Sequence, residues 1–260
     1  MHLEQATLPQ AVKIVDVRSE NAYTKTFTLD CDLTAAPGQF VMAWLPEHQD
    51  KPFSLAGVEP VKLTIAAVGP LSRAIHQCQV GDLLWIRGPL GQGYQFDFDA
   101  PTHLLMVGGG YGVAPLLYLS RLALAQGHQV TMVIGARSEA DLLLADAFNE
   151  LGVSLWLTTE DGSVGMQGRV TDAVTQIFET PSVDVTESVK PTTLYACGPT
   201  GMLSALATQC ERENVAVQLA WEAHMRCGIG LCGSCEVGAG WLTCLDGPMF
   251  QFDPQRVPPK

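Results

Sequence analysis

Short hydrophobic runs, broken by glycine and proline, dominate the first hundred residues. The runs are rich in Val, Ile, Leu, Phe and Thr, which favours β-strands. Turn signals such as Ala36-Pro37-Gly38 and Gly69-Pro70 separate them. Evenly spaced short strands of this kind predict an antiparallel β-barrel. The predicted strands cover residues 11–17, 24–29, 39–45, 63–67 and 83–87, and a short helix is predicted at 72–78.

Strand-like and helix-like patterns alternate after Pro101. Short apolar runs are followed by longer stretches with helical periodicity, and this alternation predicts a parallel sheet with helices on both faces. The predicted strands cover 104–107, 130–134, 154–158 and 193–197, and the predicted helices cover 115–126, 140–151, 171–178 and 202–213. The last part of the chain is rich in glycine and has no long periodic segment, apart from a predicted hairpin at 236–245. We therefore expect three parts: a β-barrel domain at 1–99, an α/β domain at 100–218 and a C-terminal lobe at 219–260.

The charge balance argues against two classes of partner. The chain has 15 Lys and Arg against 27 Asp and Glu, a formal net charge of −12. Nucleic acids and anionic membranes need clustered cations, so neither is expected to bind. The longest uncharged stretch, 100–120, contains four glycines and two prolines, which argues against a membrane span. The first ten residues lack a basic segment and an apolar segment, so a cytoplasmic protein is expected.

Four of the eight cysteines fall close together near the C-terminus. Cys227, Cys232, Cys235 and Cys244 have the spacing C-x4-C-x2-C-x8-C on a glycine-rich segment. The first two spacings are those of plant-type ferredoxins, whose thiolates hold a [2Fe–2S] cluster. A structural zinc site is the alternative, although it usually shows two C-x2-C pairs. Unligated thiols are the remaining interpretation. The pattern favours the iron–sulfur cluster, with these four cysteines as its ligands.

Two glycine turns follow predicted strands of the α/β domain. The first contains Gly108, Gly109, Gly110 and Gly112, and the second is Cys197-Gly198-Pro199. A strand, a glycine turn and a helix N-terminus can bind an anion, and ligands of open α/β sheets bind at strand ends. Two such turns on one sheet predict a shared nucleotide site. Tight turns without a ligand are the alternative, since Val113 stands where the dinucleotide fingerprint needs glycine.

A cation and a hydroxyl lie close together in the barrel segment, in the tetrapeptide Lys51-Pro52-Phe53-Ser54. Such a pair can bind a phosphate and a flavin or ribityl hydroxyl. By itself the tetrapeptide is a weak signal, because a solvated lysine in a turn has the same appearance.

The order of these motifs along the chain resembles the ferredoxin–NADP reductase superfamily. The C-terminal cysteines, together with PGQFVMAWLPEHQDKPFSLAG and TTEDGSVGMQGRVTD, resemble the electron-transfer subunits of class 1B dihydroorotate dehydrogenases. The resemblance covers about residues 10–250. It implies an oxidoreductase subunit that carries FAD and a [2Fe–2S] cluster and uses NAD.

The resemblance also implies contacts for the cofactors. Family members usually have Arg at the position of Lys51 and a Gly-Thr pair at the positions of Leu71 and Ser72, so the chain departs from the family there. The implied FAD-binding residues are Lys51, Pro52, Phe53, Ser54, Ile65, Ala66, Ala67, Leu71 and Ser72. The implied NAD-binding residues are Gly108, Gly109, Gly110, Gly112, Cys197, Gly198 and Pro199, with Glu160-Asp161 bordering the nucleotide.

The function implied is electron transfer in pyrimidine biosynthesis. Electrons from dihydroorotate oxidation would pass from a partner's reduced FMN through the cluster and FAD to NAD+, since flavins exchange both single electrons and pairs. No catalytic side chain is expected. The partner would be an FMN-containing catalytic subunit, in a heterotetramer of two plus two. Alternatives are the flavin and iron–sulfur subunit of a sulfhydrogenase, an anaerobic sulfite reductase, a ferredoxin-dependent NAD(P) oxidoreductase, or a non-enzymatic redox sensor.

The choice between NAD and NADP depends on the residues after the second strand of the α/β domain. Arg137 is a candidate for binding a 2′-phosphate, but Glu139 and Asp141 beside it oppose one. The sequence therefore favours NAD.

Overall fold

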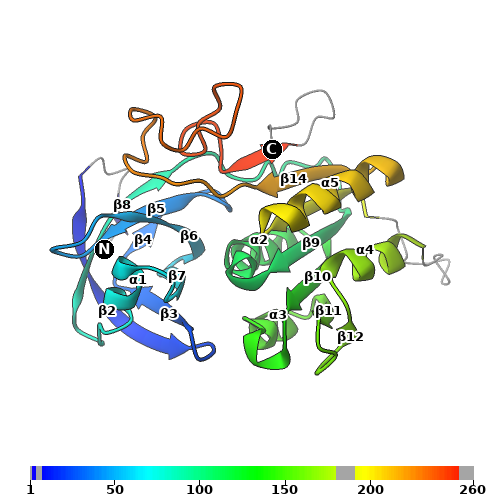
Figure 1. Ribbon diagram of the computed structural model, residues 1–260, viewed down its shortest axis with the longest axis horizontal. Helices are drawn as coiled ribbons and strands as arrows, with labels where there is room; N and C mark the ends of the chain where they lie inside the picture. Colours follow the sequence, from blue (N-terminus) through cyan, green and yellow to red (C-terminus); the bar gives the residue numbers. More distant parts are fainter. Residues whose placement is uncertain (1, 4–7, 180–190, 252–260) are drawn as a thin grey trace. The chain divides into compact units, whose positions relative to one another are not determined.

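The computed structural model describes residues 2–3, 8–179 and 191–251 (Figure 1). The chain forms two compact units. One combines Met1–Tyr94 with Trp221–Met249, and the other contains Gln95–Ala220. The glycine-rich lobe that carries the four clustered cysteines therefore belongs to the same unit as the N-terminal segment.

A closed barrel forms the centre of the first unit, as the sequence predicts. Its strands lie in the order β2-β3-β7-β6-β5-β8, and each neighbouring pair is antiparallel. The bounds are β2 Gln10–Ser19, β3 Thr24–Leu29, β5 Phe40–Trp44, β6 Lys51–Val58, β7 Val61–Ala66 and β8 Leu83–Leu90. Strand β1 (His2–Leu3) pairs with β4 (Asp32–Leu33), and helix α1 spans Pro70–Ile75, a little before its predicted place. Strand β6 was not predicted from the sequence.

Alternation along β5 gives the barrel two apolar faces. Val41 and Ala43 join the barrel core, whereas Phe40 and Met42 belong to a second cluster. This second cluster contains Phe40, Met42, Met225, Cys235 and Cys244, with Leu90, Ala223 and Leu242 packed against it. Full burial of a Met or Phe side chain is worth about 1.5–3 kcal/mol. The cysteine lobe is therefore held against the outer face of β5 and β8 by an apolar core of its own.

A parallel sheet forms the second unit, again as predicted. The strand order is β12-β11-β10-β9-β13-β14-β15, and the pairs from β12 to β14 are parallel. The bounds are β9 His103–Gly109, β10 Gln129–Ala136, β11 Ser154–Thr159, β12 Met166–Gln167, β13 Thr193–Cys197, β14 Ala216–Ala220 and β15 Met249–Gln251.

Four α-helices and two 3-10 turns accompany this sheet. They are η1 Gly110–Gly112, α2 Val113–Ala125, η2 Glu139–Asp141, α3 Ala145–Glu150, α4 Val170–Glu179 and α5 Thr200–Glu213. Helices α4 and α5 contact each other, so they share one face of the sheet. Right-handed crossovers place α2 and α3 on the opposite face. The carboxyl ends of β9 and β13 meet at the centre of the sheet, because the two strands are direct neighbours.

The predicted helix at 140–151 is wrong in its first half. Residues 139–141 form a 3-10 turn, Leu142 is extended, and Leu144 adopts φ 58°, so helix α3 begins only at Ala145. Leu143 and Leu144 are buried. Burial of these two leucines therefore takes precedence over the helical pattern.

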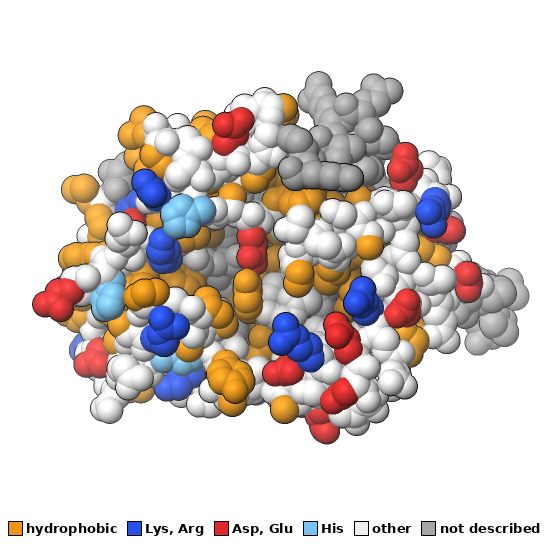
Figure 2. Space-filling model, in the orientation of Figure 1, with side chains coloured by type: hydrophobic (Ala, Val, Ile, Leu, Met, Phe, Trp, Pro, Cys, Tyr) orange, Lys and Arg blue, Asp and Glu red, His pale blue; other side chains and the backbone are white. Residues whose placement is uncertain are grey.

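Among the described residues, no helix combines the length and the apolar character that a membrane span requires. On the face drawn in Figure 2, Lys and Arg side chains are interspersed with hydrophobic, uncharged and acidic ones.

Candidate functional site

The four clustered cysteines lie on one loop system of the first unit. Cys235 and Cys244 are buried in the apolar cluster on β5, Cys227 is half-buried and Cys232 is exposed. The predicted hairpin is present as a tight turn. Glu236 and Leu242 form an antiparallel bridge, and the Val237 amide donates to the Trp241 carbonyl at 3.0 Å. This turn places Cys244 next to Cys235, with 3.3 Å between their sulfur atoms.

Backbone amides of the cysteine loop point at sulfur atoms. The amides of Leu231 and Cys232 donate to Cys227 Sγ at 3.3 and 3.4 Å, and the amide of Gly230 donates to Cys244 Sγ at 3.2 Å. Gly230 has φ 80°, a conformation that glycine adopts without steric cost. The glycine-rich sequence thus lets one short loop direct three N–H donors at two thiols.

The environments of the thiols differ. The hydroxyl and amide of Ser234 are the main causes that lower the pKa of Cys232 to about 6. Burial is the main cause that raises the pKa of Cys244, to about 12. The N–H donors at Cys227 and Cys244 fit a cluster bound by thiolates, since hydrogen bonds to sulfur accompany such clusters. The structure brings Cys235 and Cys244 together, but within the described residues it gathers no three His, Cys, Asp or Glu side chains into a set that could hold a metal ion.

The tetrapeptide Lys51-Pro52-Phe53-Ser54 begins strand β6, and all four residues are partly exposed. Pro52 pairs with Met42 and Ser54 pairs with Phe40 of β5, the strand that supports the cysteine lobe. Strand β5 lies between the tetrapeptide and β8. Phe53 packs against the barrel core, whereas Ser54 is paired with Phe40 of the second cluster. A cation and a hydroxyl are groups that can bind the phosphate and hydroxyl groups of a flavin nucleotide.

The other expected flavin residues are placed differently. The side chains of Ile65 and Leu71 belong to the barrel core and are 1% and 3% exposed. A ligand could therefore contact these two residues only through their backbone atoms. Ser72 Oγ accepts a hydrogen bond from the Gly69 amide at 2.8 Å and thereby caps α1. Ala66 and Ala67 at the end of β7 are partly exposed.

The two glycine turns of the second unit are in direct contact. Gly108 of β9 pairs with Cys197 of β13, and a Cβ on Gly112 would lie 2.3 Å from the Cys197 carbonyl oxygen. A Cβ on Gly198 would lie 3.2 Å from the Gly109 nitrogen. Glycine is therefore required for the turns to approach each other. Gly110 and Pro199 are exposed beside this contact.

Acidic groups collect where β10 and β11 end. The Glu139 amide donates to Ser163 Oγ at 2.7 Å, and the Ser163 hydroxyl donates to Asp161 Oδ1 at 2.6 Å. The hydrogen bonds from Ser163 lower the pKa of Asp161 below its ordinary value. The Ser138 hydroxyl donates to Asp141 at 3.0 Å. In open nucleotide-binding sheets, a carboxylate after the second strand accepts a hydrogen bond from a ribose hydroxyl, whereas a 2′-phosphate is accommodated by Arg.

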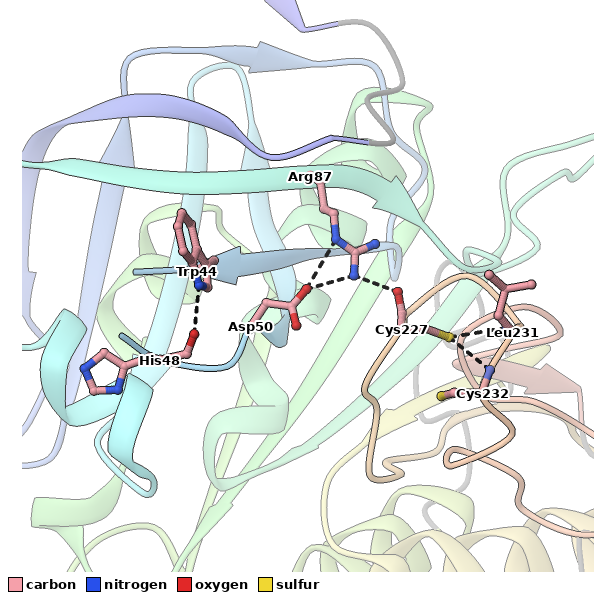
Figure 3. Close-up of polar contacts among 7 residues, drawn as sticks. All are labelled: Trp44, His48, Asp50, Arg87, Cys227, Leu231 and Cys232. Atoms are coloured by element: carbon pink, nitrogen blue, oxygen red, sulfur yellow. Dashed lines mark hydrogen bonds and ion pairs between the residues drawn. The ribbon is translucent and has the colours of Figure 1, made fainter. Parts of the chain in front are cut away.

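Sequence reasoning missed one buried cation. Arg87 of β8 is 9% exposed and forms an ion pair with Asp50, with 2.8 Å between Nη2 and Oδ2 (Figure 3). The same Nη2 donates to the carbonyl oxygen of Cys227 at 2.6 Å. Its one signal in the sequence is a charged residue within the apolar run Leu83–Leu90, since a buried charge needs a partner.

Comparison with known proteins agrees with this arrangement. Residues 106–208 match the oxidoreductase NAD-binding domain family, and residues 222–254 match the iron–sulfur cluster binding domain of dihydroorotate dehydrogenase B. The second match contains all four clustered cysteines.

Two archaeal relatives are similar over nearly their whole length. Each is named a probable dihydroorotate dehydrogenase B (NAD(+)), electron transfer subunit. The protein of Thermococcus kodakarensis is 36% identical, covering 93% of this chain and 96% of the relative. The protein of Methanocaldococcus jannaschii is 32% identical, covering 94% and 90%.

Solved structures share the fold. An NADH-dependent reduced ferredoxin-NADP oxidoreductase has a TM-score of 0.79 at 27% identity, covering 92% of this chain and 87% of the other. The FAD/NAD-binding domain of a Vibrio cholerae nitric oxide dioxygenase has a TM-score of 0.65 at 19% identity, covering 79% and 94%. The barrel, the parallel sheet and the cysteine lobe, together with relatives above 30% identity over nine-tenths of the chain, show that this protein belongs to the family of dihydroorotate dehydrogenase B electron transfer subunits.

Proposed function

We propose that this chain passes electrons from the reduced FMN of a catalytic subunit, through a [2Fe–2S] cluster and FAD, to NAD+. When bound, the cluster supplies one-electron transfer, the flavin exchanges single electrons or pairs, and NAD+ accepts a hydride. The three N–H···S bonds within a four-cysteine loop carry the proposal. Family membership supports it, because the relatives are named electron transfer subunits.

The cysteine loop would hold the cluster through Cys227, Cys232, Cys235 and Cys244. The amides of Gly230 and Leu231 donate to sulfur and stabilise negative charge there. Burial of Cys235 and Cys244 against β5 keeps water from one side of the loop. Exposure of Cys232 leaves the other side open to a partner.

The remaining residues would bind the two nucleotides. Lys51 and Ser54 of β6 would contact the phosphate and hydroxyl groups of FAD, and Ala66 and Ala67 would lie along the flavin. The glycine turns of 108–112 and 197–199 would accept NAD at the strand ends. The carboxylates of Glu139 and Asp161 would select NAD over NADP. We propose no general acid or base for this chain.

A reconstitution tests the proposal. The purified chain alone is expected to oxidise NADH with artificial acceptors and to leave dihydroorotate unchanged. Addition of the FMN-containing catalytic subunit from the same organism is expected to give NAD-linked orotate formation, in an assembly of two copies of each chain. Dihydroorotate oxidation by the isolated chain, or no NADH formation by the pair, would contradict the proposal.

The exposed apolar side chains of the cysteine loop would contact that catalytic subunit. Leu231 is 81% exposed, and Ile229, Trp241 and Leu245 are also exposed. They lie between or next to the cysteines along the loop, and exposed apolar patches mark interaction surfaces. Leu231→Asp is expected to weaken assembly by more than tenfold while NADH oxidation with dyes continues. Val80→Asp is the control, because Val80 is 62% exposed in a turn of the same unit before Gly81. Equal assembly of both variants would refute this interface.

A second function has one observation in its favour. The solved structure with a TM-score of 0.79 is named a ferredoxin-NADP oxidoreductase. The same chain would then accept electrons from reduced ferredoxin instead of a reduced FMN. Two electron donors should therefore be compared at equal NAD+ concentration. One is reduced ferredoxin added to the chain alone, and the other is dihydroorotate added to the chain together with the catalytic subunit. We expect the dihydroorotate pair to give the faster NADH formation.

A further inference from the structure

A partly buried ion pair connects the segment just before strand β6 with the cysteine loop. Arg87 lies on β8, Asp50 is the residue before Lys51, and Cys227 is the first cysteine of the loop (Figure 3). Arg87 Nη2 donates to Asp50 Oδ2 at 2.8 Å and to the Cys227 carbonyl oxygen at 2.6 Å, and Nε reaches the same carboxylate oxygen at 3.3 Å. One guanidinium therefore contacts both segments at once.

Asp50 is held in place by its own loop. The indole N–H of Trp44 donates to the His48 carbonyl at 2.8 Å, and the His48 amide donates to the Leu45 carbonyl at 3.1 Å. The Trp44 ring also packs edge-on against Trp85 of β8, with 5.5 Å between ring centroids. These contacts hold the segment that precedes Asp50 in place, and Asp50 itself pairs with Arg87.

The cysteine loop is placed by the same patch of barrel. Arg87 and Met42 are directly paired residues of β8 and β5, so their side chains point to the same face. A Cβ on Gly228 would lie 3.0 Å from Met42 Cγ. The chain after Cys227 therefore rests on Met42, while Arg87 holds the Cys227 carbonyl beside it.

We propose that Arg87, paired with Asp50, is a positioning residue for the iron–sulfur centre, and that it sets the centre's potential as well as its retention. This inference rests on the proposed function, in which Cys227 is a cluster ligand. A residue behind a metal ligand typically changes metal affinity by about 10–100-fold when it is removed. The positive guanidinium stabilises the negative charge that a cluster gains on reduction, so it raises the cluster's potential. The negative Asp50 carboxylate destabilises that charge and lowers the potential.

The two partners therefore predict opposite shifts. In Arg87→Met the carboxylate of Asp50 is left without its cation, so the midpoint potential of the cluster falls. In Asp50→Asn the guanidinium is left without its anion, so the potential rises. Arg87→Lys keeps the positive charge and is expected to lie closer to the wild type than Arg87→Met. A purely structural role would not produce shifts of opposite sign.

The experiment measures the cluster spectroscopically in the full-length purified chain. The midpoint potential comes from an EPR-monitored redox titration, and retention comes from the rate of iron loss to a chelator. Arg87→Met is expected to lose iron about tenfold faster than the wild type, with its FAD content retained. Arg18→Met is the matched control, because Arg18 of β2 pairs with Glu20 at 3.6 Å and is half exposed.

Shifts of the same sign in Arg87→Met and Asp50→Asn, or wild-type potentials in both, would overturn the inference. If Arg87→Met fails to fold, two other results decide the question. They are a rise in the midpoint potential of Asp50→Asn and a potential and iron-loss rate of Arg87→Lys close to those of the wild type. Cys227→Ser separates this inference from the proposed function. A cluster that is fully retained in Cys227→Ser contradicts the ligand assignment, whereas an unaltered cluster in the Arg87 and Asp50 variants contradicts only the positioning role.

Discussion

A methyl group added at Gly112 tests how closely the two glycine turns of the parallel sheet approach each other. Gly112 has φ −61°, which alanine adopts freely, so any cost of Gly112→Ala comes from steric overlap. The added Cβ would lie 2.3 Å from the Cys197 oxygen and 2.5 Å from its carbonyl carbon. Relief of the overlap requires a backbone shift of about 1 Å, since overpacking in a dense interior is not absorbed locally.

The expected cost is about 2–3 kcal/mol of unfolding free energy, within the usual range for overpacked sites. In a protein of this size it lowers Tm by about 4–12 °C in a thermal melt followed by circular dichroism. NADH binding, measured by titration, is expected to weaken by about tenfold because the Cys197–Gly198 turn must move.

Gly201→Ala is the control for this prediction. Nothing lies within 4 Å of a Cβ at Gly201, which is in helix α5, so the variant should gain about 0.5–1 kcal/mol from a better helix former. A Tm for Gly112→Ala within about 1 °C of the wild type would refute the contact between the turns.

Three other changes have defined outcomes. Cys232→Ser is expected to abolish the iron–sulfur EPR signal while FAD, bound in the barrel, is retained; loss of both in equal measure would contradict separate sites. Lys51→Arg is expected to tighten FAD by about 1 kcal/mol through a bidentate contact, measured as Kd after flavin removal, and equal or weaker binding would contradict it. Stability is expected to fall as the pH drops below about 6.5, because burial lowers the pKa of His128, whose Nδ1 accepts the Thr102 amide at 3.1 Å. The folded state then binds the proton less readily than the unfolded chain. The loss should be smaller in His128→Gln, and an equal loss in that variant would show that His128 is not responsible.

The barrel and the sheet were predictable because their patterns are local. Runs such as Thr24–Leu29 and Thr193–Cys197 carry the period and composition of strands, and glycine turns mark their ends. Strand β6 was missed because Lys51-Pro52 gives a turn signal, although the barrel tolerates Pro52 opposite Met42. The break before α3 depends on burial of Leu143 and Leu144, which no local pattern reports.

The candidate site was predictable only where its residues are close in sequence. The cysteine spacing identifies the loop, whereas the bond from Arg87 to Cys227 joins residues 140 positions apart. The placement of Ile65 in the barrel core follows the alternation of β7, in which Val61, Leu63 and Ile65 share one face. The sequence alone therefore does not identify which distant residue pairs with a buried charge. It also does not show whether a side chain of a predicted strand faces the core or a ligand.

An anaerobic titration of the purified chain with NADH, followed by EPR and by iron, sulfide and metal analysis, tests the central claim most directly. The account predicts two irons and two labile sulfides per chain, together with FAD, as the composition of a [2Fe–2S] flavoprotein requires. It also predicts that NADH produces the signal of the reduced cluster. A single zinc without labile sulfide, or a flavin that is reduced by NADH while the cluster stays oxidised, would contradict it.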